Sequence, residues 1–303
     1  MHLWDESKGG SLEKPQEHSM LCPNLEPSDS ITTLLNKLTS SGNNSPYSEQ
    51  VYWGAKHYNL NKSKLFNSLS EEQQTETILR LNKWSLELIY FIEKFGLNYG
   101  AKMILNAHSE EEKSLYSLFA ADEVNHRILI EPFLIDGKPK DISIHPLLAA
   151  LATCLKDGSK ETMTFTIQVI LEGFGLMHYN TLKNTCTNQN LANVFHLILK
   201  DEVNHHGMGV ALTKKTTLND KQSSEVTDMT ALFVRSLIDA EWVLKSISET
   251  CGGLTKDQVI EFKKDILWAE SQSFKIDKMS QLIRKTGSVK VYESLLNKGV
   301  FKF

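Results

Sequence analysis

The chain has 303 residues, of which 41% are hydrophobic and 23% charged, so it can form one large globular domain or two small ones. A formal net charge of −4, a pI near 6.2 and the absence of any lysine run longer than a pair argue against a binding surface for nucleic acid or for an anionic membrane. The four cysteines are far apart and show no CxxC spacing, which argues against a disulfide framework and against a thiolate metal site.

The chain starts with Met-His-Leu-Trp-Asp-Glu, which lacks the basic and then apolar regions of a secretory leader. It contains no uninterrupted apolar run of the roughly 20 residues that span a membrane. We therefore expect a cytoplasmic protein with reduced thiols.

Residues 1–66 are predicted to form an irregular N-terminal arm with one short helix. Three prolines lie among Ser, Gly, Glu and Lys in residues 1–29, a composition that buries too little apolar surface to form a core alone. Residues 30–40 have the spacing of a short helix, which should end before the loop-like Ser-Gly-Asn-Asn-Ser-Pro at 41–46.

The remainder, 67–303, is predicted to be one helical domain. Ser70 and Ser109 each precede Gln or Glu by three residues, which is the capping-box signature of a helix start. Glu93 lies on an apolar face within 86–105 and should therefore point into the core. A first helical hairpin is expected at about 85–131. The second helix of this hairpin should present one buried face, formed by Tyr116, Phe119, Glu123, His126 and Ile130.

A short apolar helix at 145–155 should bridge to a second hairpin at about 160–214, in which Asn188 takes the place of Ser109. Accessory C-terminal helices are expected within 222–298, as two long helices at about 224–249 and 256–285 and a short tail helix. Thr255 and Gln258 form the capping box of the second long helix. No stretch alternates with the period of a strand, so the predicted class is all-α.

The two hairpins are related by an internal duplication. Residues 122–126 and 201–205 both read Asp-Glu-Val-Asn-His, an offset of 79 residues. The same offset maps Glu93, in Ile-Glu-Lys-Phe-Gly-Leu, onto Glu172, in Leu-Glu-Gly-Phe-Gly-Leu. Each copy therefore carries a Glu and, 30 residues later, a Glu-x-x-His.

The spacing predicts a dinuclear metal site inside a four-helix bundle. The break at 108–109 lies 15 residues from both Glu93 and Glu123, so a hairpin folded there brings both carboxylates to one level. Burying four carboxylates in an apolar interior is prohibitively costly without compensating cations. Such ligand sets bind two metal ions in ferritin-like proteins, with iron as the first expectation and manganese or a mixed Mn/Fe pair as the alternative. The predicted ligands are Glu93, Glu123, His126, Glu172, Glu202 and His205.

Several neighbouring residues have expected supporting roles. Asp122 and Asp201 precede the ligand glutamates and are candidates to hydrogen-bond the outer nitrogens of the ligand histidines, either on the same helix or across the bundle. Tyr90, Tyr116 and Tyr179 are interpreted as core aromatics rather than redox groups. Three further histidines, His178, His196 and His206, are interpreted as structural or surface residues. Residues beside the ligands are candidates to line a pocket: Gly96, Gly175, Phe119 and Ile198.

The pattern of Glu93 and Asp122-Glu123-x-x-His126, repeated at Glu172 and Asp201-Glu202-x-x-His205, resembles the arylamine N-oxygenase family of ferritin-like diiron enzymes, the p-aminobenzoate type. The resemblance covers residues 93–205 and implies the same six ligands. It implies a reaction in which dioxygen oxidises an amine. That family carries a further histidine ligand one turn before the second Glu-x-x-His, where this chain has Ile198. The comparison therefore supports the dinuclear site more strongly than the N-oxygenase chemistry.

The predicted function is a non-haem dinuclear iron oxygenase that uses O2 to oxidise a small organic substrate, with amine N-oxygenation as the first reading. Because acyl-carrier-protein desaturases are also similar in their paired Glu-x-x-His motifs, hydroxylation or desaturation of a C–H bond is the alternative. Iron oxidation and storage is a third reading. The chain shows no clustered cysteines and no flavin motif, so the electrons should come from a separate ferredoxin or reductase. The sequence leaves the oligomeric state open, a homodimer included.

Overall fold

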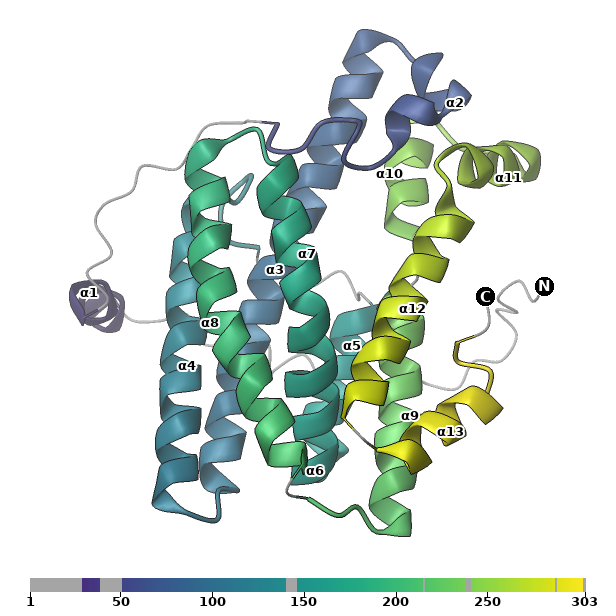
Figure 1. The fold of residues 1–303 in the computed structure, drawn as a ribbon. Helices are drawn as coiled ribbons and strands as arrows, with labels where there is room; N and C mark the ends of the chain where they lie inside the picture. Colours follow the sequence, from purple (N-terminus) through teal and green to yellow (C-terminus); the bar gives the residue numbers. More distant parts are fainter. Residues whose placement is uncertain are drawn as a thin grey trace, which may run out of the picture.

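The computed structural model describes residues 29–38, 51–139, 146–214, 216–237, 241–286 and 288–301. Every regular element within these ranges is helical, which confirms the all-α class for this part of the chain (Figure 1). No helix among them is long and apolar enough to cross a membrane. The predicted short helix is α1 (Asp29–Leu38). The proline-rich segment before it and the loop at 41–46 lie outside the described residues.

Two helical hairpins stand side by side and form the bundle (Figure 1). The first pairs α3 (Glu71–Leu105) with α4 (Glu110–Ile130), which continues into a short 3-10 turn, η3 (Glu131–Phe133). The second hairpin begins with a continuous rod and returns through α8 (Gln189–Lys214). The rod consists of α6 (Lys160–Met163), η4 (Thr164–Leu171) and α7 (Glu172–Thr185).

The helix starts follow the capping signals in the sequence. Ser70 and Gln73 form a complete capping box at the start of α3, as predicted. Ser109 Oγ accepts the backbone N–H of Glu112, but the Glu112 carboxylate bonds to His108 N and to Lys160 instead of closing the box. At the corresponding turn of the second hairpin, Asn188 Oδ1 accepts the Leu191 N–H at 3.0 Å.

The rod of the second hairpin contains a π-helical segment that the sequence did not reveal. Residues Thr164–Leu171 have π-helical hydrogen bonding, and the Glu172 N–H donates to the Ile167 carbonyl five residues earlier. The equivalent stretch of the first hairpin lies within the uninterrupted α3. The two copies of the duplication therefore differ in backbone just before their upstream glutamates.

Accessory helices cover one side of the bundle (Figure 1). They are α5 (Pro146–Asp157), α9 (Asp220–Leu237), α10 (Glu241–Cys251), α11 (Lys256–Asp265), α12 (Trp268–Lys285) and α13 (Val289–Asn297). The predicted helix at 256–285 begins with the expected Thr255 capping box but is broken at Leu267, whose φ is 53°. The break lets Phe262 and Ile266 pack into a small second core while α12 turns along the bundle. The predicted helix at 224–249 is seen as α9 and α10, on either side of residues outside the described ranges.

Residues 51–66, which the sequence analysis assigns to the arm, belong to the core instead. Tyr52 and Trp53 are fully buried, and the segment continues through η2 (Leu60–Lys62) into α2 (Lys64–Asn67). Buried Asn82 of α3 holds the segment: its Oδ1 accepts the N–H groups of Tyr52 and Trp53 at 2.8 Å each, and its Nδ2 donates to the Trp53 carbonyl. Sequence reasoning missed this contact because the amide partners are 29 and 30 residues away.

We predict that Asn82→Leu lowers the free energy of unfolding by about 2–5 kcal/mol, because it leaves two buried N–H donors without an acceptor and each costs about 1–3 kcal/mol. Urea unfolding of the purified variant measures this loss. Asn193→Ala is the control, since Asn193 is exposed and bonds only to the Gln189 side chain among the described contacts; its effect should stay within about 0.5 kcal/mol. A loss below about 1 kcal/mol in Asn82→Leu would contradict this role.

Candidate metal centre

The structure brings the six predicted ligand residues together in the bundle core. Glu93 comes from α3, Glu123 and His126 from α4, Glu172 from α7, and Glu202 and His205 from α8. None of the six side chains is more than 9% exposed. The Glu and His of each Glu-x-x-His share a helix face because residues three apart in an α-helix are neighbours.

The donor atoms fall into two overlapping groups, each able to hold a metal ion. One group contains Glu93, Glu123, His126 and Glu202, and the other contains Glu123, Glu172, Glu202 and His205. Within each group the donor atoms lie within 4.8 Å of one another. Since Glu123 and Glu202 belong to both groups, the geometry suits two neighbouring ions that share these carboxylates.

Both histidines turn Nδ1 inward and Nε2 toward an aspartate on the opposite helix. His126 Nδ1 lies 3.1 Å from Glu93 Oε2, while its Nε2 lies 3.2 Å from Asp201 Oδ2. His205 repeats this, with Nε2 lying 3.3 Å from Asp122 Oδ2. An aspartate that accepts the Nε2–H leaves the Nδ1 lone pair free for a metal. The sequence left open whether these partners lie on the same helix or across the bundle, and the structure places them across it.

Without metal, three of the four carboxyl groups favour the protonated form. Burial and repulsion from the other glutamates raise the pKa of Glu123 well above its usual range, and the same causes raise that of Glu172. Burial raises the pKa of Glu202 to about 8. Glu123 Oε1 accepts no hydrogen bond among the described residues. A buried oxygen without a donor and carboxyls that resist ionisation fit a site completed by cations.

Glu93 differs from the other three because donors surround it. Burial raises its pKa, but the His126 imidazole and a hydrogen bond from the Tyr179 hydroxyl outweigh burial and lower it. Conversely, the Glu93 and Asp201 carboxylates raise the pKa of His126 despite its burial. Tyr179, interpreted from sequence as a core aromatic, therefore contacts the site directly. The only sequence signal for this contact was that Tyr179 shares a helix face with Glu172. That signal did not identify Glu93 as its hydrogen-bond partner.

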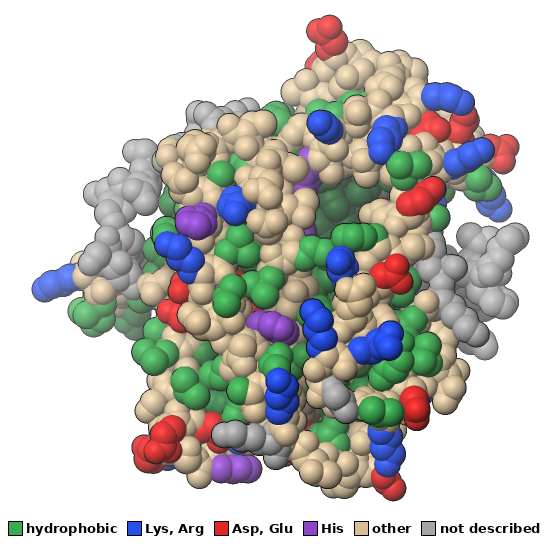
Figure 2. All heavy atoms as spheres, viewed as in Figure 1, with side chains coloured by type: hydrophobic (Ala, Val, Ile, Leu, Met, Phe, Trp, Pro, Cys, Tyr) green, Lys and Arg blue, Asp and Glu red, His purple; other side chains and the backbone are tan. Residues whose placement is uncertain are grey.

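A cavity of about 340 Å³ lies beside the carboxylates, and Figure 2 shows a hollow on this face between α7 and α12. The four site glutamates lie on its wall together with Trp84 of α3 and Trp242 of α10, whose rings stack at 3.9 Å. His178 and Lys275 also line it. His178 is exposed at the edge of the cavity, whereas burial lowers the pKa of Lys275. The cavity therefore has one side lined by carboxylates, aromatic walls, and side-chain nitrogen groups contributed by α7 and α12.

The four residues proposed from sequence to line a pocket divide into two pairs. Gly96 and Gly175 do line the cavity, whereas Phe119 and Ile198 are buried in the core outside it. The Phe119 ring packs against the His205 imidazole, with centroids 4.2 Å apart. A Cβ on Gly96 would lie 2.2 Å from Glu123 Oε2, but a Cβ on Gly175 would meet nothing within 4 Å. Gly96 thus makes room for the Glu123 carboxylate, and Gly175 borders open space.

The three other histidines weighed from sequence lie outside both donor groups. His196 is exposed, His178 faces the cavity, and His206 lies beside the π-helical segment with its Nδ1 3.2 Å from the Gln168 carbonyl.

The residues of the cavity wall could not be predicted from helical periodicity, because Trp242 and Lys275 come from accessory helices whose docking depends on tertiary contacts.

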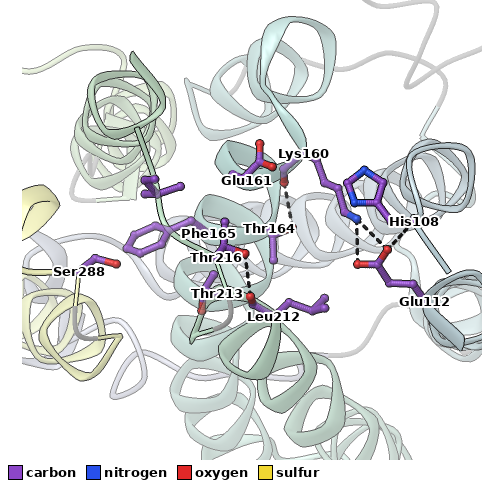
Figure 3. Close-up of a pocket in the computed structure, with 11 residues that line it drawn as sticks. His108, Glu112, Lys160, Glu161, Thr164, Phe165, Leu212, Thr213, Thr216 and Ser288 are labelled. Carbon is purple, nitrogen blue, oxygen red and sulfur yellow. Dashed lines mark hydrogen bonds and ion pairs between the residues drawn. The ribbon is translucent and has the colours of Figure 1, made fainter. Parts of the chain in front are cut away.

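A second pocket, of about 190 Å³, lies at the start of α6, away from the glutamate cluster (Figure 3). Several of its polar groups already have hydrogen-bond partners. Lys160 Nζ donates to both carboxylate oxygens of Glu112, at 2.8 and 2.7 Å, and the Thr213 hydroxyl donates to the Gly209 carbonyl. The half-buried Lys160–Glu112 pair ties the start of α4 to the start of α6, which is a structural role.

Comparisons of the chain with protein-family models, with curated proteins and with solved structures give no match. The site therefore has to be interpreted from its own geometry.

The raised carboxyl pKa values predict how metal-free protein responds to pH. A carboxyl whose pKa is higher in the folded state binds more protons there than in the unfolded chain, so stability falls as pH rises from about 5 toward 8. The pKa of Glu93 is lowered, so its titration changes the stability only at a pH below this window. The free energy of unfolding of Glu123→Gln should decline less steeply with pH, and at pH 8 it should exceed that of the wild type by roughly 1–4 kcal/mol. Urea unfolding with chelator at pH 5.5 and 8 tests this; parallel declines would contradict it.

The contrast between the two cavity glycines gives a matched pair of variants. Gly96→Ala should push the Glu123 carboxylate aside and weaken binding of divalent metal at least about 10-fold. Gly175→Ala should leave metal binding unchanged and raise stability by up to about 1 kcal/mol, because Ala favours a helix over Gly. Calorimetric metal titration and urea unfolding measure both effects. Equal metal affinities in the two variants would show that Glu123 is not a ligand.

Proposed function

We propose that this chain is a ferritin-like dinuclear iron oxygenase that uses O2 to oxidise a small organic substrate. The observation that carries the proposal is the pair of overlapping donor groups, which are buried in the bundle and border a cavity on one side. Ferritin-like dinuclear proteins combine a Glu from each of two helices with a Glu-x-x-His from each of the other two. Here α3 and α7 supply the single glutamates, and α4 and α8 supply the Glu-x-x-His pairs.

In this proposal each ion has its own Glu and His, and the two ions share two carboxylates. Glu93 and His126 would hold the first ion and Glu172 and His205 the second, while Glu123 and Glu202 belong to both donor groups. Carboxylate and imidazole donors suit iron, with manganese or a mixed pair as the alternative. The ions would supply dioxygen activation and the electrons stored in their reduced form.

The protein's own residues would prepare the site for that chemistry. Asp122 and Asp201 keep the proton on Nε2 of the facing histidines, so that Nδ1 can bind metal. The Tyr179 hydroxyl fixes the Glu93 carboxylate by a hydrogen bond. Trp84 and Trp242 would present an aromatic wall to an organic substrate.

The substrate is proposed to be an amine, with C–H oxidation as the second reading. Amine oxidation follows the resemblance of the two ligand motifs to the arylamine N-oxygenases. The C–H alternative is favoured by two observations: the extra histidine of that family is replaced by Ile198, which is fully buried, and the cavity walls are rich in apolar side chains. Electrons are proposed to come from a separate donor, because the described cysteines Cys154, Cys186 and Cys251 are free and scattered.

We expect the purified protein to bind about two iron ions per chain. The double variant Glu93→Ala/Glu172→Ala removes from each ion the one glutamate that it does not share with the other ion, and should lose most of this metal. Its matched control, Glu72→Ala/Glu111→Ala, removes two exposed glutamates from the starts of α3 and α4 and should bind two ions. Elemental analysis after gel filtration provides the count. Full occupancy in the first double variant would refute the ligand assignment.

Oxygen consumption by protein loaded with Fe2+ then separates the readings. An amine panel and a fatty-acyl panel are offered with a chemical reductant under 18O2, and products are identified by mass spectrometry. Label in an oxidised amine supports the first reading, and hydroxylated or desaturated acyl products alone support the second. Uptake of many irons per chain into a mineral, with neither panel oxidised, would refute both.

A further inference from the structure

The π-helical segment ends at a metal-site glutamate, and this junction releases one backbone carbonyl. In an α-helix the Glu172 N–H would donate to the Gln168 carbonyl, four residues earlier. Here it donates to Ile167 instead, so the Gln168 carbonyl loses its α-helical donor. His206 Nδ1 lies 3.2 Å from that carbonyl. Because a carbonyl only accepts, the imidazole donates an Nδ1–H to it.

Two glycines allow this contact by bringing the helices close together. A Cβ on Gly209 of α8 would lie 2.4 Å from the Gln168 Cβ and 3.0 Å from its carbonyl carbon. A Cβ on Gly173 would lie 2.9 Å from Cε1 of the His206 ring. Any larger residue at either position would displace the π-helical backbone or the imidazole.

The internal duplication shows that this arrangement belongs to the second hairpin alone. With the offset of 79, His206 corresponds to Arg127, Gly173 to Lys94, and Gly209 to Ile130. Gln168 corresponds to Ile89, within the uninterrupted α-helix α3. The residues that surround the released carbonyl are therefore absent from the copy that has no π turn.

We propose that His206 is a positioning residue that holds the π turn and thereby sets Glu172 in place. Each residue added to a helical turn rotates the following side chains by about 100°, since 3.6 residues complete an α-helical turn. The π turn therefore decides whether the Glu172 carboxylate faces Glu123, Glu202 and His205. This inference rests on the proposed function, because it assigns Glu172 to one of the two ions.

The test is a titration of metal-free protein with Co2+, followed by calorimetry and by visible absorption of the bound ion. Wild-type protein should bind two ions. His206→Leu should weaken one binding step by about 10- to 100-fold, the usual effect of losing a residue that supports a ligand, and leave the other step unchanged. His206→Asn keeps an N–H donor near the Nδ1 position and should restore that step to within about threefold.

Arg127→Leu is the matched control, since it changes the equivalent position of the first hairpin and should leave both steps unchanged. Should His206→Leu fail to fold, Gly173→Ala tests the same contact by pushing the imidazole away, with Lys94→Ala as its control. Two unchanged steps in these His206 and Gly173 variants, or equal weakening of both steps, would overturn the role of His206. Wild-type protein that binds no Co2+ would instead overturn the proposed function itself.

Discussion

Four carboxylates placed in an apolar interior repel one another, and the rest of this structure depends on how that repulsion is relieved. Only Glu93 has enough donors of its own to stay ionised, from His126 and Tyr179. The pKa values of Glu123, Glu172 and Glu202 are raised, so these carboxyl groups are either protonated or need cations to compensate their charge. A fold that kept such a cluster for stability alone would gain by replacing it with apolar residues. The cluster is therefore best understood as a binding site that the fold tolerates.

The duplication supplies a nearly symmetric set of ligands, but the surroundings break that symmetry. Each histidine has the same partner, an aspartate from the opposite Glu-x-x-His helix. The glycines three residues after Glu93 and Glu172 differ in their surroundings. The Glu123 carboxylate occupies the space beside Gly96, whereas Gly175 faces open space. The π turn precedes only Glu172. Both glycines line the cavity, but there would be more free space beside the ion held by Glu172 than beside the ion held by Glu93.

Features that depend on neighbouring residues or on the repeated offset could be predicted from the sequence, whereas features that depend on contacts between distant residues could not. The hairpins, their caps and the convergence of six side chains follow from helical periodicity and from one repeated offset. The cavity wall could not be predicted, because Trp84 and Trp242 meet only through the packing of α10 against α3. Likewise, Tyr52 and Trp53 enter the core through a single distant side chain, Asn82. The π-helical segment was hidden because its apolar residues also fit α-helical spacing, and His206, the residue proposed to hold it, lies on another helix.

This division assigns the two parts of the proposed chemistry to different parts of the chain. The bundle helices contribute every candidate metal ligand, while accessory helices complete the cavity with Trp242, Trp268 and Lys275. Under the proposed function, changes on α10 or α12 would therefore alter which substrate fits without moving a candidate ligand. The resemblance in the ligand motifs consequently informs the metal chemistry more than the substrate. Ile198 packs in the core and lies outside both donor groups. Under the proposed function, the six donors would therefore have to support the reaction, and the aromatic wall would select the substrate.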